Sequence, residues 1–448
     1  MFISAVIIIF YPSPLSHSLV NEDYVFIGRI KNYFSLYDTF ITQFFNIEFY
    51  RPITQTIFYF ISYKLFNLNP VGYHIFILAL FIANNFLVFE IAEKLTQRKD
   101  LALIASIFYA SRIKIHFFPV YSISAGFQET GMAFFMLCTI LLYLLYCKER
   151  NVLLYISSLI CSLFAALSKE TSVILPALIF LLEMYLCTLN IKQHLRKITL
   201  RLIPFCIPTM IHISRLYLIS SKFIEGAYSV GFSLHALVDN MIFYLTNPIN
   251  QRFESFIVLI IFLTAFIFEN RKYTIVSLAW FFIGLSPFLL LRHHASGYYL
   301  SISLFGFSLL FSSGIKYYYD KFSVSKYVLP PILVIIFMTF AHYNVVNKEY
   351  LADLIAQEKI TNNVLTYFKN NYPTFPPNSL IYIKNSDIEM NFALGGASGI
   401  KILYSNNISV YFEGVSKKLP MKYNQVYYFY YDHDKAILQY IDKSNIVK

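Results

Sequence analysis

The chain contains 448 residues, of which 57% are hydrophobic and only 14% are charged. A soluble protein carries about 25% charged residues, so the composition excludes a cytosolic enzyme, a disordered chain and a nucleic-acid-binding module. The formal net charge is +11, but the basic residues fall between apolar segments, as the positive-inside rule for membrane proteins predicts. The sequence therefore predicts an α-helical polytopic membrane protein.

Apolar runs near 20 residues predict the spanning helices. The first run is short and is interrupted by Pro12 and Pro14, and we interpret it as a real span, either truncated or complete. About eleven spans are expected, at residues 2–15, 71–92, 101–118, 130–147, 152–168, 171–189, 201–220, 254–269, 273–291, 298–315 and 327–344.

The short basic connections between these spans fix the expected orientation. Lys and Arg gather in one alternate set of loops, for example at 94–99 and 192–201, which places this set in the cytoplasm. The N-terminus is then cytoplasmic, and the protein is expected in the plasma (inner) membrane. A long first outer loop, 16–70, contains stretches that are apolar on one face, which is typical of helices lying along a membrane surface.

The last hundred residues differ in composition from the rest. Residues 1–344 are expected to form the transmembrane domain, and 345–448 a small extracytoplasmic α/β domain. In this tail the pattern predicts a helix, then a Pro-rich turn, then four strands. The helix is expected at 348–370 and the strands near 380–384, 401–404, 408–412 and 425–431.

Charged side chains at the outer ends of the spans are the candidates for chemistry. The adjacent acids Glu22 and Asp23 are either solvated loop residues or a general base with a neighbour that tunes it. Arg51 either anchors at the lipid headgroups or faces an anionic substrate group. His74, at the start of a span, is either a structural hydrogen-bonding residue or a substrate ligand.

Two further groups lie at outer boundaries. Glu129 is either an acid favoured by the helix dipole or a substrate contact. Lys169 and Glu170 occupy a turn with almost no loop between two apolar segments, where charges are costly and usually functional. The bland interpretation of that pair is mutual neutralisation, with both side chains reaching toward water.

A third outer group precedes a late span. Arg292, His293 and His294, followed by Tyr299, would suit a phosphate or pyrophosphate group. Adjacent histidines point in different directions, so metal ligation by this pair is weakly supported. The cysteines lie in or beside apolar segments and no CxxC pair occurs, so neither a zinc site nor a disulfide framework is expected.

The order of these motifs resembles a known family. After the acidic pair come YRPIT, NPVGYHIFILALFIANN, FFPVYSISAGFQET, ALSKETSVILPAL and GYYLSISLFGFSLL. Over about residues 15–315 the chain resembles the GT-C superfamily of membrane glycosyltransferases, closest to protein O-mannosyltransferase-like members of prokaryotic type. The late family motif usually has Arg before its Tyr, whereas here Tyr298 precedes Tyr299.

The resemblance implies a GT-C fold and inverting transfer of a sugar from a polyprenyl-phosphate donor to an acceptor hydroxyl on the extracytoplasmic face. It implies that Asp23 acts as general base, with Glu22 as the neighbour that could exchange roles. Lys169 and Arg51 would hold the lipid phosphate, and Glu129 would face the sugar or acceptor. Because of the departure at Tyr298, the residues at 292–294 would stand in as phosphate ligands.

The sequence is also consistent with two other functions. A lipid-linked sugar transporter or flippase would use the same cations without chemistry, but no repeat is visible and the charges lie at the outer boundary. A polysaccharide polymerase or ligase usually places its basic residues in a late outer loop, whereas here the long loop comes first. The expected partners are a lipid-linked sugar donor and a glycan, glycolipid or protein acceptor, with no nucleic acid, no certain cofactor and no expected divalent metal.

Overall fold

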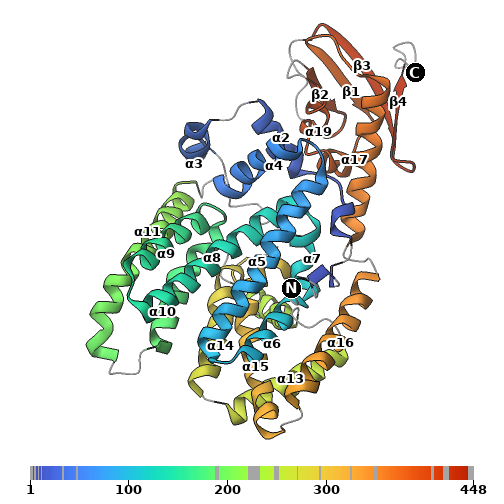
Figure 1. Cartoon of the computed structure of the whole chain (residues 1–448). Coiled ribbons are helices and arrows are strands. Elements are labelled where there is room, and N and C mark those ends of the chain that lie inside the picture. Colours follow the sequence, from blue (N-terminus) through green and yellow to red (C-terminus); the bar gives the residue numbers. More distant parts are fainter. Residues whose placement is uncertain are drawn as a thin grey trace.

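The structure is a computed structural model in which a helical body carries a smaller unit with a β-sheet at the C-terminal end (Figure 1). The described residues are 4, 7–8, 10–11, 13–32, 35–46, 49–186, 191–219, 233–246, 252–269, 271–291, 294–322, 325–346, 351–404, 408–416 and 423–441.

The body is built from apolar segments. They are helical because a helix satisfies its own backbone hydrogen bonds without water. Their buried residues form one continuous hydrophobic core, in which Trp280 and Phe281 are fully buried. The helices are α5 (Pro70–Thr96), α6 (Lys99–Ala110), α7 (Ile113–Tyr121), α8 (Ile123–Glu149), α9 (Val152–Ala166), α10 (Leu175–Leu186), α11 (Ile191–Ile219), α12 (Leu234–Thr246), α13 (Arg252–Phe268), α14 (Arg271–Leu285), α15 (Ser303–Lys321) and α16 (Ser325–Val346).

The number of clear membrane spans is smaller than expected. Among the described residues, α5 and α8 are long and apolar enough to cross a bilayer, and the pair α6 and α7, bent by 65°, is a third if it counts as one span. The expected count of about eleven is therefore unconfirmed. Length is one reason, since an apolar helix such as α9 has only 15 residues where about 20 are needed.

The first outer loop is helical over much of its length, and in two stretches, 38–46 and 52–66, a π-helical segment continues directly into an α-helix. The helical elements are α2 (Glu22–Asn32), the π-helical η2 (Asp38–Thr42), α3 (Gln43–Asn46), the π-helical η3 (Pro52–Ile57) and α4 (Phe58–Phe66). Aromatic side chains of this loop pack with Tyr73 and Phe127 from α5 and α8 in a second hydrophobic cluster. The loop is thereby fixed to the body.

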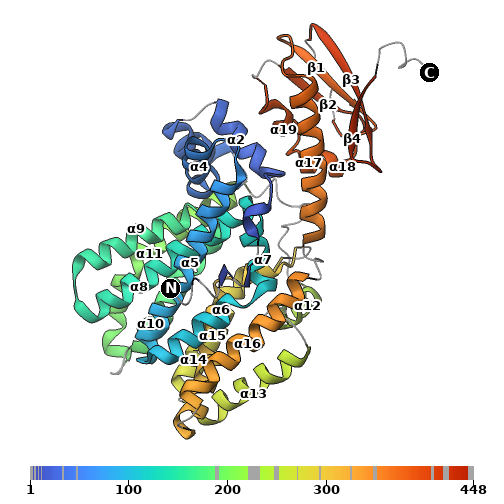
Figure 2. The same ribbon diagram turned by 45° about the vertical axis from the view of Figure 1, so that its right-hand side comes forward.

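The C-terminal unit, residues 351–441, consists of α17 (Ala352–Asn371), α18 (Ile388–Ala393), α19 (Ser398–Lys401) and a sheet. The strands are β1 (Ser379–Lys384), β2 (Ile408–Phe412), β3 (Gln425–Asp432) and β4 (Ile437–Ile441), in the order β2-β1-β3-β4. Strand β1 pairs in parallel with β2 and β3, and β4 is antiparallel to β3. Figure 2 shows α17 running from the body to one face of this sheet.

Most expected elements of this unit are confirmed, and one is wrong. The helix and three of the expected strands correspond to α17, β1, β2 and β3. The strand expected at 401–404 is instead the end of α19 and the turn after it. Ile400, in α19 just before this segment, is fully buried in the core of the unit. The short apolar run that indicated a strand therefore belongs to the end of a helix and the following turn. Strand β4 was not expected from the sequence.

Candidate active site

A cavity of about 740 Å³ lies where the first outer loop, the beginning of α8 and the turn before α10 meet. Its wall is completed by the segment before α15 and by α18 of the C-terminal unit. The residues that line it are Asn21, Glu22, Phe49, Arg51, Gln55, Phe118, Ser124, Ala125, Gln128, Glu129, Lys169, Glu170, Thr171, Val173, Ile213, Pro287, Phe288, Leu291, His294, Tyr298, Tyr299 and Phe392.

Two cations with acidic partners form the polar centre of this wall. The Nε and one terminal nitrogen of Arg51 donate to Glu170 at 2.9 and 2.8 Å, a bidentate arrangement. The other terminal nitrogen of Arg51 donates to the side-chain oxygen of Gln128. The ammonium of Lys169 pairs with Glu129. Lys169 and Glu170 therefore do not neutralise each other, because each binds a residue from another part of the chain.

Burial makes these pairs unlike surface salt bridges. The side chains of Lys169 and Glu129 are 7% and 3% exposed, and those of Arg51 and Glu170 are 11% and 15% exposed. Charges taken out of water to this extent are costly unless they are paired or bind a ligand. The four groups also border the cavity, so an anionic group bound there would meet both cations directly.

The adjacent acids of α2 have different surroundings. Glu22 is exposed and lines the cavity. Asp23 is 1% exposed and lies behind it, where the Tyr59 hydroxyl donates to one carboxylate oxygen at 2.5 Å and the Val20 N–H to the other at 3.0 Å. Burial raises the pKa of Asp23 from 3.8 to about 7, although both hydrogen bonds act in the other direction. Glu22 is thus the carboxylate that a bound substrate can reach.

Aromatic rings form the part of the wall next to Lys169. Tyr299 stacks on Phe288, with ring centroids 4.2 Å apart and planes at 10°, and Tyr298 stacks on Phe118 at 5.6 Å and 25°. The Lys169 ammonium lies 5.0 Å from the centroid of the Tyr299 ring. His294 is within 3.3 Å of the Tyr298 hydroxyl. Flat rings beside polar groups suit a ligand with both apolar and hydroxyl-bearing faces.

The structure brings most of the predicted site residues to this cavity but not all of them. His74 is 1% exposed, lies outside the lining set and has its ring 6.4 Å from that of His17. Its expected role as a substrate ligand is therefore not supported, because its ring is buried in α5. Arg292 and His293 lie outside the described residues.

Some cavity residues could not be expected from their local sequence. Phe392 comes from the C-terminal unit, far along the chain from the other lining residues. Behind the wall, α11 contributes His212 and Arg215, which are 4% and 2% exposed, and Arg215 donates to the Phe44 carbonyl at 2.8 Å. Ionisable residues inside an expected apolar span are a signal of function, and this signal could have drawn attention to α11.

Comparison with known proteins gives a clear answer for the fold. No family model matches the chain, and no curated protein sequence matches it. Among solved structures, ArnT from Cupriavidus metallidurans in the apo state aligns with 88% of this chain and 84% of its own, at 12% identity and a TM-score of 0.55. The chain has the ArnT fold. At 12% identity this likeness shows a shared fold over most of both chains.

A second structure of the same protein, ArnT bound to undecaprenyl phosphate, aligns with 90% of this chain and 75% of its own, at 13% identity and a TM-score of 0.47. At such identities the likeness concerns the arrangement of the chain. A shared fold does not imply shared chemistry, which depends on the residues of the cavity.

Proposed function

We propose that the protein is a membrane glycosyltransferase that moves a sugar from a polyprenyl-phosphate donor to an acceptor hydroxyl, with inversion at the sugar carbon. The observation that carries this proposal is one cavity in which an accessible carboxylate, Glu22, shares the wall with two buried cations, Arg51 and Lys169. Group transfer from a phosphate-linked donor needs both parts, because a proton leaves the acceptor and negative charge grows on the leaving group.

Glu22 is the better candidate for the base. Asp23, the other member of the pair, has both oxygens occupied by Tyr59 and Val20 and is shielded from the cavity. We assign it the role of holding the start of α2. This uses the exchange of roles between the two acids that the sequence left open.

The reaction then proceeds in one displacement. The acceptor hydroxyl gives its proton to the Glu22 carboxylate, its oxygen bonds to the anomeric carbon, and the bond from that carbon to the phosphate oxygen breaks. The electron pair stays with the polyprenyl phosphate, whose charge Arg51 and Lys169 offset. Their acidic partners Glu170 and Glu129 keep the cations in place before the donor binds.

The same proposal includes the kind of sugar that is transferred. The transferred unit is a hexose or a pentose, and the aromatic wall around Tyr298 and Tyr299 would hold its flat face.

The proposal also includes the orientation of the protein in the membrane. We place the cavity and the C-terminal unit on the extracytoplasmic side and the N-terminus in the cytoplasm. Residue 344 is kept as the end of the transmembrane domain. Arg292 and His293 are retained as further phosphate ligands, and no metal enters the mechanism.

The test uses purified protein in nanodiscs. Radiolabelled undecaprenyl-phosphate sugars, chosen because ArnT was crystallised with undecaprenyl phosphate, are incubated with the protein, and release of undecaprenyl phosphate is followed with a membrane extract as the source of acceptor. We expect release by the wild type and its loss in Glu22→Gln. In proteoliposomes, movement of intact donor across the bilayer at equal rates in both proteins, with no release, would refute the transferase and favour a flippase.

A further inference from the structure

The C-terminal unit contacts the first outer loop at Asn21, the residue that precedes Glu22. The backbone N–H of Asn21 donates to the carbonyl of Ala393, at the end of α18, at 2.7 Å. The Thr361 hydroxyl of α17 donates to the same carbonyl at 3.0 Å. One carbonyl therefore connects the start of α2 to two helices of the C-terminal unit.

A glycine permits this approach. Gly395 has a φ of +59°, and a Cβ added there would lie 2.3 Å from the backbone oxygen of Asn21. A Cβ atom does not come within 3.0 Å of a non-bonded backbone oxygen in proteins. Any residue other than glycine at position 395 would therefore displace the backbone beside Glu22. The next residue, Gly396, has a similar φ of +65°, but the nearest atom to a Cβ there is Asn391 Oδ1 at 3.9 Å. The two glycines share the backbone strain and differ in the contact.

Further contacts hold both ends of the same segment. The Glu358 carboxylate of α17 accepts from the Ser18 N–H at 2.7 Å and is 3.0 Å from the ring of His17. At the other end, the Lys31 ammonium donates to the Ile402 carbonyl at 2.6 Å. Residues 17–31 are therefore fixed to the C-terminal unit at the start, at Asn21 and at the end.

Helix α18 also contributes a side chain to the cavity. Phe392 lies on α18, is 51% exposed and belongs to the cavity lining together with Asn21 and Glu22. Ile388, at the start of the same helix, is 77% exposed and lies outside the lining set. Figures 1 and 2 both show α2 and the C-terminal unit next to each other.

From these contacts we propose that the backbone at Ala393 and Gly395, between α18 and α19, positions the catalytic base, and that Phe392 borders the acceptor. The Ala393 carbonyl sets the position of the Glu22 carboxylate through the backbone of Asn21, and the Phe392 ring forms the wall against which the acceptor binds. Asn21 and Gly395 are thus positioning residues for the base. This inference rests on the proposed transferase function.

Gly395→Ala and Gly396→Ala test the positioning role as a matched pair. A displacement of about 1 Å at a reacting group can cost about 100-fold in rate. We expect Gly395→Ala to lower kcat by about 10- to 100-fold with an unchanged KM for the donor, and Gly396→Ala to lower it less than about threefold. Equal activity of the two variants would overturn the proposal.

Hydrogen–deuterium exchange gives a readout that does not depend on activity. Faster amide exchange is expected in the peptide covering residues 17–32 for Gly395→Ala and not for Gly396→Ala. Faster exchange with wild-type kcat would overturn the positioning role. If the wild type transferred no sugar from any donor, the proposed function would fail, whereas the exchange result alone would still decide whether the turn holds α2.

Phe392→Ala tests the acceptor wall. We expect the KM for the acceptor to rise about tenfold while the KM for the donor stays the same, because Phe392 precedes Ala393, whose carbonyl accepts from the Asn21 N–H beside Glu22. Ile388→Ala, on the same helix, is the control and should behave as wild type. A selective rise in the donor KM, or the same effect from both variants, would exclude an acceptor wall at Phe392.

Discussion

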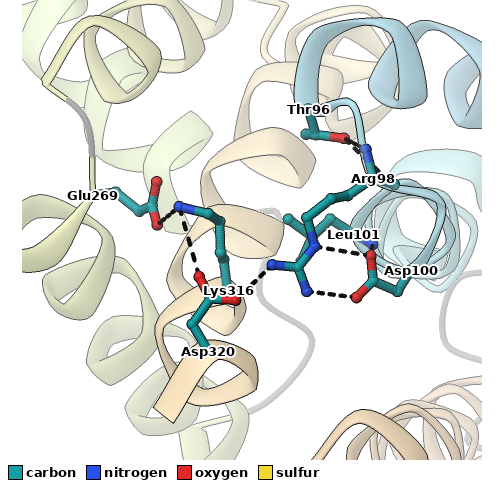
Figure 3. Close-up of polar contacts among 7 residues, drawn as sticks. All are labelled: Thr96, Arg98, Asp100, Leu101, Glu269, Lys316 and Asp320. Carbon is teal, nitrogen blue, oxygen red and sulfur yellow. Dashed lines mark hydrogen bonds and ion pairs between the residues drawn. The ribbon is translucent and has the colours of Figure 1, made fainter.

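Two clusters of charge use the same residue types for different purposes. The first borders the cavity and joins Arg51 to Glu170 and Lys169 to Glu129. The second lies beyond the end of α5 and links the turn before α6 to α13 and α15 (Figure 3). Its members are Arg98, Asp100, Glu269, Lys316 and Asp320.

Burial and the neighbouring space separate the two. In the second cluster Arg98 is 25% exposed and binds Asp100 in a bidentate manner, and Asp320, 51% exposed, accepts from its third nitrogen at 2.7 Å. Glu269 is 9% exposed, but the other four charged side chains of this cluster are 25–51% exposed. None of its residues belongs to the cavity lining. We interpret the second cluster as a clamp, meaning that its ion pairs join neighbouring helices, and the first cluster as a binding site for an anionic ligand. Ion pairs alone do not indicate function, whereas buried ion pairs beside a cavity do.

The largest expected effect is at the carboxylate that completes the first cluster. Glu22→Gln keeps the shape of the side chain and removes the proton acceptor, so turnover should fall about 10²- to 10⁴-fold. Binding of undecaprenyl phosphate, measured by thermal shift, should not change. Asp23→Asn should reduce turnover much less. The reverse order of the two variants would return the role of base to Asp23.

Removing one partner of a buried pair should be costly in the first cluster and cheap in the second. Lys169→Met leaves Glu129 unpaired at 3% exposure, which should destabilise the protein by about 3–5 kcal/mol. Asp320→Asn acts on a side chain that is 51% exposed, and its partners Arg98 and Lys316 keep Asp100 and Glu269, so it should cost less than about 1 kcal/mol. Thermal unfolding in detergent measures both.

The double variant Lys169→Met with Glu129→Gln separates stability from binding. It should recover most of the stability, because no charge is left unpaired, yet bind undecaprenyl phosphate as weakly as the single variant. Recovery of binding together with stability would mean that Lys169 only neutralises Glu129.

A pH-dependent effect should distinguish Asp23 from Glu22. Because burial raises the pKa of Asp23 from 3.8 to about 7, the folded protein holds this proton more tightly than the unfolded chain. Stability should therefore fall as the pH rises from about 4 to about 7 and then stay level, by up to ~4 kcal/mol in total. Asp23→Asn should lack this component, so its melting temperature should gain on that of the wild type between pH 5 and pH 8. A constant difference would contradict the burial of an ionisable group at this position.

The sequence predicts the parts of the site better than their partners. Glu22, Arg51 and Lys169 were recognisable because charge at the end of an apolar segment is costly and therefore informative. Their partnerships were not predictable, because Lys169 pairs with Glu129, 40 residues away, and such contacts depend on how the helices pack. Phe392 carries no local signal at all, because its role comes from the docking of the C-terminal unit on α2.

The same division applies to the fold. Hydropathy predicted where helices occur, and α5 and α8 correspond closely to the expected spans 71–92 and 130–147. It did not predict the bend between α6 and α7, where the buried guanidinium of Arg112 lies 4.2 Å from the Phe108 ring centroid. In the tail, alternation could not distinguish α19 from a strand, because a four-residue run is too short to show its period.

The smallest expected effect gives the sharpest comparison, because one conservative change can be made in both clusters. Arg51 and Arg98 each bind a carboxylate through two nitrogens, and lysine keeps the charge but loses this fork. Arg51→Lys should raise the KM for the lipid-phosphate donor by about 10- to 100-fold, the range of a charge-assisted hydrogen bond worth about 1.5–3 kcal/mol. Arg98→Lys should leave both KM values and turnover unchanged and shift stability by no more than about 1 kcal/mol. A loss of turnover in Arg98→Lys would show that the second cluster communicates with the cavity, and that the clamp and the ligand site are one system.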